Sequence, residues 1–511
     1  MSATSEPAAT AAWARKEVRQ AVWALLMGSF AAVLASTIVT NALPAMVADL
    51  GASQSAYTWV VTVELLALTA SVPVWGKLAD LYDQKRLLQL SMLIFIVGSI
   101  AAGAAANLEL LLAGRVLQGI GAGGLTALVQ IVIAAMIPPR ELGRLGGMFS
   151  VAFAVATVAG PLIGGFLVDI PLLGWRWCFY IGVPVCLIAM VQAHRNLKLA
   201  TVPRGGKVDY PGAVLVVAAV CTLLLWISLG GKQFDWVSGT SLLLLLASVA
   251  LFALFAFVES RATEPIVPLR IFRNRTVTLS LVGVFFVGVG MFGSTVFLTQ
   301  YFQLALGHQP SVAGLMSLPM ILAIMLVSPV SGSWITRTGH WRGFLIAGGF
   351  LLVAGLGLLG TIDAHTPWWL TVGYTVVLGV GIGLLVQNMI LVVQNDVAAI
   401  DLGVATAAVT FFRQIGGTIG VAALGAVLAA QVAAAGYGAV PKIHDLDPAA
   451  ATVVRDAYGT ATGEVFLLAT PLAALALIAI LFLRQIPLKT QSGAERLAAE
   501  TAAAEAEAAK A

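Results

Sequence analysis

The chain has 511 residues, of which 59% are hydrophobic and only 10% are charged, and its net charge is +4. Soluble domains carry about 25% charged residues, so this composition excludes a soluble enzyme or a nucleic-acid-binding protein and indicates a multi-pass membrane protein. Three cysteines without a C-x-x-C pair predict neither a disulfide framework nor a metal site.

Fourteen segments are long and apolar enough for membrane helices, each of which needs about 20 residues to cross the hydrocarbon core. In chain order they are 20–43, 58–78, 87–106, 108–136, 146–168, 177–194, 211–230, 240–259, 277–304, 312–335, 343–361, 369–395, 403–431 and 463–484. The largest inner loops, 195–210 and 260–276, flank the seventh and eighth segments. We therefore predict an all-α integral membrane protein with 14 transmembrane helices arranged as 6+2+6.

This plan divides the chain into five parts. They are a cytoplasmic tail at 1–19, a six-helix bundle at 20–194, an inserted helix pair with its loops at 195–276, a second six-helix bundle at 277–484, and an Ala/Glu-rich cytoplasmic tail at 485–511. We expect residues 491–511 to form a frayed helix or to be disordered. The outer loop at 432–462 is long enough for a short surface helix.

The positive charges predict which way the chain crosses the membrane, because Lys and Arg gather on the cytoplasmic side. With the N-terminus inside, 22 of the 28 Lys and Arg residues fall in inner segments and four in outer segments. The remaining two, Arg115 and Arg413, fall inside spans. Both termini are therefore predicted to be cytoplasmic.

The second span carries one carboxylate, Glu64, far from either end. A charge in hydrocarbon costs several kcal/mol, so such residues usually face a cavity and mark proton or ion pathways. Glu64 and Arg115 each lie about 10 Å from the outer end of their spans, at 1.5 Å per residue. Ser36 lies at the same level, and Gln118 lies one turn below Arg115. We predict a polar cluster in which Glu64 carries the coupled proton beside Arg115, with a static ion pair as the alternative.

The fifth span is rich in small residues. Gly147, Gly160, Gly164 and Gly165 permit close approach between helices, and Pro161 removes one helix hydrogen bond and bends the helix. Generic tight packing is the alternative interpretation of these residues.

The inner loop after the second span begins at Gly76, which permits a tight helix end. Asp80 can sit on the positive N-terminus of a neighbouring helix, and Arg86 helps to hold the loop inside. These residues predict a structural or gating motif, although an ordinary solvated loop would have a similar composition.

Polar residues also interrupt the spans of the second half. They are Thr295, Gln300, Gln387, Asn388, Arg413 and Gln414. The amides can satisfy the arginine, or the group can contact a substrate in a wet cavity, and the sequence leaves both possibilities open.

Taken together, these motifs resemble the fourteen-span drug:proton antiporter branch of the major facilitator superfamily over 20–484. The matching stretches are TIVTNALP at 37–44, RVLQGIGAGG at 115–124, GPLIGG at 160–165 and FFRQIGG at 411–417. The resemblance implies two six-helix bundles, an extra helix pair, and a central cavity that opens alternately to each side. It also implies export of amphipathic or cationic toxic compounds, or of an antibiotic by its producer. We expect a monomer in the bacterial inner membrane.

The chain departs from this family at three places. Ala35 replaces the acidic residue that many relatives carry in the first span, so the coupling role falls on Glu64. Glu64 itself replaces a residue that is uncharged in most relatives, and recognition of substrate charge is its alternative role. The inner loop has Leu81, Asp83 and Gln84 where the family usually has Arg, Gly and Arg.

The energy source follows from what the sequence lacks. No G-x-x-x-x-G-K-[ST] nucleotide loop is present, so we expect a proton gradient to drive transport without a cofactor. The expected partners are an amphipathic small molecule, protons and the lipid bilayer. Export of a dedicated natural product, a lipid or a siderophore is the alternative. A membrane enzyme is disfavoured because no H-x-x-x-D or D-D-x-x-D constellation occurs.

Overall fold

The computed structural model describes residues 16–50, 54–170, 174–197, 209–231, 233–262, 264–308, 310–434 and 448–508. Within the helices α1, α2, α5, α11, α15, α16 and α17, some side chains lie outside this description. The described chain is helical, with one isolated bridge between Gly230 and Phe234. The first group of helices is α1 (Lys16–Asp49), α2 (Gln54–Leu81), α3 (Gln84–Gly103), α4 (Leu108–Met136), α5 (Pro139–Asp169), α6 (Trp177–Tyr180) and α7 (Gly182–Asn196). An inserted pair follows, α8 (Tyr210–Leu229) and α9 (Gly239–Glu259).

The second group follows a short 3-10 helix, η2 (Leu269–Arg273). It comprises α10 (Arg275–Gln300), the π-helical turn η3 (Tyr301–Ala305), α11 (Pro310–Met316), α12 (Leu318–Thr338), α13 (Arg342–Leu359), α14 (Trp368–Asp396), the 3-10 turn η4 (Ala399–Asp401), α15 (Leu402–Ala434), α16 (Pro448–Leu481) and α17 (Gly493–Ala508).

Thirteen helical stretches in the described part are long and apolar enough to cross a membrane, and each matches one predicted span. The remaining predicted span, 146–168, lies within α5, a helix of 31 residues. The coarse prediction of an all-α protein with many membrane helices is therefore confirmed.

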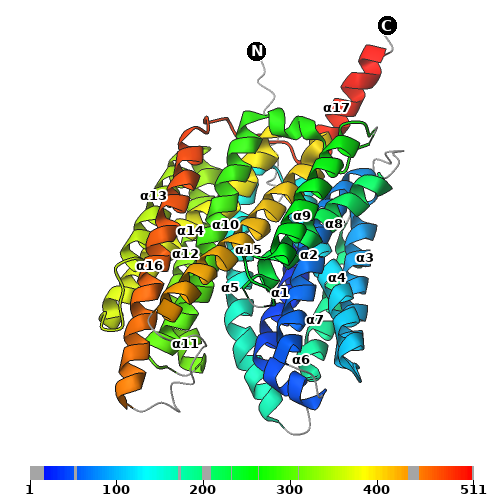
Figure 1. Ribbon diagram of the computed structural model, residues 1–511. Helices are drawn as coiled ribbons and strands as arrows, with labels where there is room; N and C mark the ends of the chain where they lie inside the picture. The colour runs from blue at the N-terminus through cyan, green and yellow to red at the C-terminus, as the bar shows by residue number, and fades with distance from the viewer. Residues whose placement is uncertain are drawn as a thin grey trace.

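The helices form two groups that lie side by side (Figure 1). In the first, α1 packs on α5 and α7, while α4 packs on α2 and α3. In the second, α10 packs on α15 and α16, while α14 packs on α12 and α13. Helix α17 lies at one end of the molecule, the top of Figure 1. We call this end the terminal end and the opposite end the far end.

The inserted pair covers one seam between the two groups. Helix α8 packs against α9, against α2 of the first group, and against α15 of the second. Buried Val216, Val220 and Leu224 of α8 meet Leu66 and Ala70 of α2. At the terminal end, Lys77 of α2, with only 7% of its side chain exposed, pairs with Glu264 at 2.8 Å.

The structure corrects two expectations about the end of the chain. Helix α16 begins at Pro448, so residues 448–462 continue the last span instead of forming a separate surface helix. Proline suits a first helical position, and the alanines that follow are strong helix formers. Residues 435–447 of the predicted loop lie outside the described chain.

The tail is a docked helix at its start and not a frayed one. Arg496 is only 5% exposed and donates to the carbonyl oxygens of Gln394, at 3.1 Å, and Val397 at the end of α14. The carboxylate of Glu500 accepts from the backbone N–H of Ala399 at 3.2 Å. Both contacts place a charge where it complements the helix terminus it meets. The sequence missed them because the partners are backbone groups far away in the chain.

Candidate transport site

Glu64 and Arg115 form a buried ion pair between α2 and α4, as predicted. They are 4% and 1% exposed, and Nη2 of Arg115 donates to Oε2 of Glu64. Arg115 also donates from Nε to the Val60 carbonyl oxygen at 3.1 Å and from Nη1 to Oε1 of Gln118 at 2.7 Å. The second carboxylate oxygen of Glu64, Oε1, is buried and has no hydrogen-bond partner in the described chain. Arg115 therefore has hydrogen-bond acceptors for all three of its nitrogens, whereas one carboxylate oxygen of Glu64 lacks a hydrogen-bond donor.

Close helix packing explains how these side chains meet. A Cβ on Gly119 of α4 would lie 2.5 Å from the backbone oxygen of Glu64, so only glycine lets α2 approach this closely. Gly98 of α3 likewise lies against the backbone of Gln118. Gly98 and Gly119 therefore let α3 and α2 approach α4 closely enough for these side chains to meet.

The sequence missed three partners of this cluster. Ser99 of α3, which is fully buried, accepts from Nε2 of Gln118 at 2.9 Å. The Phe179 ring lies 5.7 Å from the guanidinium carbon of Arg115, and Val60 contributes its carbonyl oxygen. A serine or phenylalanine in a membrane helix gives no distinctive signal, and a carbonyl acceptor gives none.

Ser36 does not join the cluster. Its side chain is exposed, while its neighbours Ala35 and Ile38 are fully buried. Adjacent residues of a helix point about 100° apart, so equal depth did not imply an equal face. The depth of Ser36 in the membrane was predicted correctly, but the predicted direction of its side chain was wrong.

The predicted motif of the fifth span packs α5 on α1. A Cβ on Gly160 would meet Cβ of Thr37 at 2.6 Å, and one on Gly164 would meet the Ile38 backbone oxygen at 2.6 Å. Gly147, Pro161 and Gly165 belong to α5, but their immediate surroundings lie outside the described residues. The contacts at Gly160 and Gly164 fit the close-approach interpretation.

Asp80 joins the two helix groups at the terminal end. Its carboxylate accepts from the backbone N–H groups of Gly403 and Val404, at 2.9 and 3.0 Å, in the first turn of α15. A carboxylate at this position satisfies two orphan donors and complements the helix dipole. Gly76 lies beside it against Ala407 and Gly403. Arg86 takes no part in this contact: it is exposed and lies 3.9 Å from Asp83, the N-cap of α3.

Glutamine pairs extend this contact between the groups. Nε2 of Gln387 donates to Oε1 of Gln130 in α4 at 3.2 Å, and Gln394 lies 3.4 Å from the Gln130 carbonyl oxygen. Asn388 is instead 2% exposed and donates within its own group, to the Leu384 carbonyl oxygen at 2.8 Å. Gln387 therefore contacts the other group, whereas Asn388 fixes packing. Gln130 was missed, because a single glutamine gave no pattern.

The other candidates of the second group lie on α10 and α15. Thr295 is exposed and donates to the Met291 carbonyl oxygen of its own helix at 2.9 Å. Oε1 of Gln300 is buried without a partner in the described chain. Arg413 and Gln414 are both partly exposed, and the predicted bond between the arginine and the neighbouring amides does not occur in the described chain.

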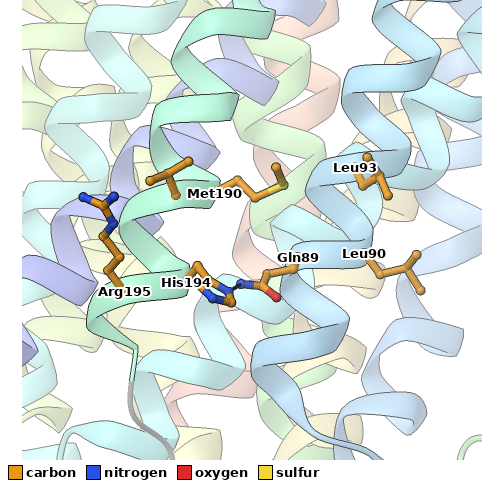
Figure 2. A pocket seen from close by; sticks show the side chains of 7 residues that line it. Gln89, Leu90, Leu93, Met190, His194 and Arg195 are labelled. Carbon is orange, nitrogen blue, oxygen red and sulfur yellow. Dashed lines mark hydrogen bonds between the residues drawn. The ribbon is translucent and has the colours of Figure 1, made fainter.

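A groove of about 470 Å³ lies elsewhere, on the outer surface between α3 and α7 near the terminal end (Figure 2). Gln89 and His194 point toward one another across it and form a 2.8 Å hydrogen bond. Its walls include the exposed side chains Leu90 and Leu93. It shares no lining residue with the Glu64 cluster, and we do not assign it to transport.

Two packed groups of membrane-length helices, with a buried ion pair in one and polar contacts between both, define a polytopic membrane transporter. The sequence profile of the Major Facilitator Superfamily matches residues 25–421. The chain belongs to this family.

Named relatives agree with this assignment. Multidrug transporter protein MdtP of Bacillus subtilis is 36% identical over 408 residues, covering 80% of this chain and 74% of the relative. Multidrug resistance protein 3 of the same species is 30% identical and covers 92% and 96%. Among solved structures, the proton:xylose symporter XylE is similar in fold, with a TM-score of 0.63 at 12% identity over 94% of this chain and 98% of that one.

Proposed function

We propose that this protein is a proton-coupled exporter of amphipathic drugs or toxic compounds. Its relatives include proteins named as a multidrug transporter and a multidrug resistance protein, and the shared sequence spans most of both chains. We place it in the bacterial inner membrane as a monomer with both termini in the cytoplasm, which makes the terminal end the inner side. The proton gradient supplies the energy without a cofactor.

We also propose the 6+2+6 plan of fourteen spans, with α5 as the fifth. Residues 20–194 and 277–484 then form the two bundles, 195–276 the inserted pair, and 1–19 and 485–511 the tails. The packing of α1 to α7 and of α10 to α16 into separate groups supports this division.

The unpartnered Oε1 of Glu64 is the single observation that carries proton coupling. Arg115 keeps two further acceptors, Val60 and Gln118, when its bond to Glu64 weakens. A proton arriving from the outer side can therefore settle on Oε1 and remove the negative charge without leaving the arginine unpaired. Protonation thus changes the charge of the cluster by one unit while its packing stays intact.

Alternating access requires two arrangements of the bundles, and the contacts indicate which one this is. In the described chain, the hydrogen bonds between the two groups join Asp80, Gln130 and Arg140 to α15, α14 and α12, all toward the inner side. These bonds support an inner side that is closed. A proton or drug shifts the equilibrium between the two arrangements only by the difference between its affinities for them.

Dye efflux in a pump-deficient bacterium tests the proposed function. Cells producing the protein should accumulate less of at least one amphipathic dye or drug than cells without it, and an uncoupler should abolish the difference. Extrusion that persists with the proton gradient collapsed and ATP intact would contradict proton coupling. Equal accumulation of every compound in a broad panel would contradict drug export.

A further inference from the structure

Arg413 is the one deep charge whose partner is missing from the described part of the chain. Glu64, Arg115 and Arg413 are charged residues that lie well inside the spanning helices. Glu464 of α16 lies instead level with the loop after α13, because its neighbour Gly463 lies against the Ile362 backbone oxygen. Glu64 and Arg115 neutralise each other. Arg413 lies eleven residues after Leu402, the start of α15, which is about 17 Å along the helix. It therefore sits near mid-membrane.

The atoms of Arg413 differ in their surroundings. Nε is buried without a hydrogen-bond partner. The two terminal nitrogens, Nη1 and Nη2, make no hydrogen bond or ion pair in the described chain, yet they are not among its buried unpartnered atoms. They therefore keep accessible surface. Charged side chains at this depth face the bundle interior or a water-filled cavity and not lipid, and α2, α4, α8, α10, α14 and α16 surround α15, which favours a space between helices.

The residues around Arg413 are apolar or uncharged. Gly416, Gly417 and Gly420 share its side of α15 and lie against Phe285, Phe292 and Val289 of α10. On α15 itself, Phe412 precedes the arginine and the partly exposed Gln414 follows it. An arginine stays protonated even in such a site, so its positive charge is stabilised there by an anionic partner.

The first span adds no charge to this interior. Ala35 is fully buried and uncharged, so in the described spans the carboxylate at this depth is Glu64, held by Arg115. The interior of the spanning helices therefore has a net charge of one positive unit.

We propose that Arg413 is a substrate-binding residue and that the preferred substrates are amphipathic anions, with a carboxylate or sulfonate for the guanidinium and an aromatic body for the phenylalanines. This inference rests on the proposed function and goes further by naming the substrate class. Nη1 and Nη2 form a planar fork that matches two oxygens of one acidic group.

Two xanthene dyes of opposite charge, fluorescein and rhodamine 123, test this proposal. We would measure binding to the purified wild type, Arg413→Gln, Arg413→Lys and the exposed control Arg484→Gln by fluorescence anisotropy at pH 7.5. Wild type should bind fluorescein more tightly than rhodamine 123. Arg413→Gln should weaken fluorescein binding about 10- to 100-fold, the range for a lost hydrogen bond to a charged group. Arg413→Lys should lose less, and Arg484→Gln should match wild type.

Three results would overturn the proposal: a wild-type preference for rhodamine 123, no fluorescein binding by wild type, or unchanged fluorescein affinity in Arg413→Gln. If Arg413→Gln does not yield folded protein, the dye preference of wild type and Arg413→Lys decides the question. Uncoupler-sensitive efflux of rhodamine 123 without fluorescein binding would refute the anion preference and leave the proposed exporter standing.

Discussion

Replacing Glu64 with glutamine should convert the exporter into an uncoupled carrier. The amide oxygen of glutamine can still accept from Nη2 of Arg115, so the cluster keeps its shape while it loses the site that gains and loses a proton. The mutation also leaves Arg115 without its counter-charge. Breaking a buried ion pair by removing one partner costs about 3–5 kcal/mol, so we expect lower stability, softened by the bond that remains.

The size of the transport effect follows from the membrane potential. One proton crossing 100 mV supplies about 2.3 kcal/mol, which is about a 50-fold gradient of an uncharged drug exchanged for one proton. The wild type in proteoliposomes should approach that ratio under a potassium-diffusion potential. Glu64→Gln should reach equal drug concentrations on both sides, with drug-for-drug exchange intact.

The exposed residue Glu109 in the first turn of α4 provides a matched control. Glu109→Gln makes the same chemical change outside the cluster and should sustain the wild-type gradient. A Glu64→Gln protein that holds the 50-fold gradient would refute the assignment of the proton to Glu64.

Three further predictions concern contacts outside the cluster. Asp80→Ala should open the inner side, because it removes a helix cap worth about 0.5–2 kcal/mol. The distance between spin labels at 86 and 340 should then increase. The control Asp83→Ala, which uncaps only α3, should leave that distance unchanged. Arg496→Ala should release the tail, because it removes hydrogen bonds worth about 1.5–3 kcal/mol. The rate of amide hydrogen exchange across 487–500 should rise at least tenfold. Exchange as slow as in wild type would refute the docking contact. Hydrogen bonds from Trp175 and Arg176 lower the pKa of Asp49 below its usual 3.8, so its stabilising effect is complete above roughly pH 5 and is lost as the pH falls through the lowered value. Wild type should therefore lose more thermal stability than Asp49→Asn on acidification to pH 3, and parallel losses would contradict this reasoning.

The spans and the depth of charged residues could be predicted from the sequence because each depends on a local property. Apolar length predicted thirteen described spans, and counting residues placed Glu64 and Arg115 at one level. The Asp80 contact was also expected, since a carboxylate at the end of one helix suits the start of another.

Direction and long-range docking could not be predicted in this way. Ser36 shares the depth of the cluster but not its face, and Asn388 lies one residue from Gln387 yet serves a different contact. The docking of Arg496 depends on backbone carbonyls a hundred residues away, which carry no mark in the sequence. Side-chain direction and backbone partners are set by tertiary packing.

Proton release on drug binding tests the central claim most directly. Purified protein in weakly buffered detergent solution, mixed with a drug that it exports, should release protons that a pH indicator dye can count. Wild type should release up to one proton for each drug molecule bound, Glu109→Gln should match it, and Glu64→Gln should bind drug without release. Equal proton release by wild type and Glu64→Gln would show that the exchanged proton resides on another group.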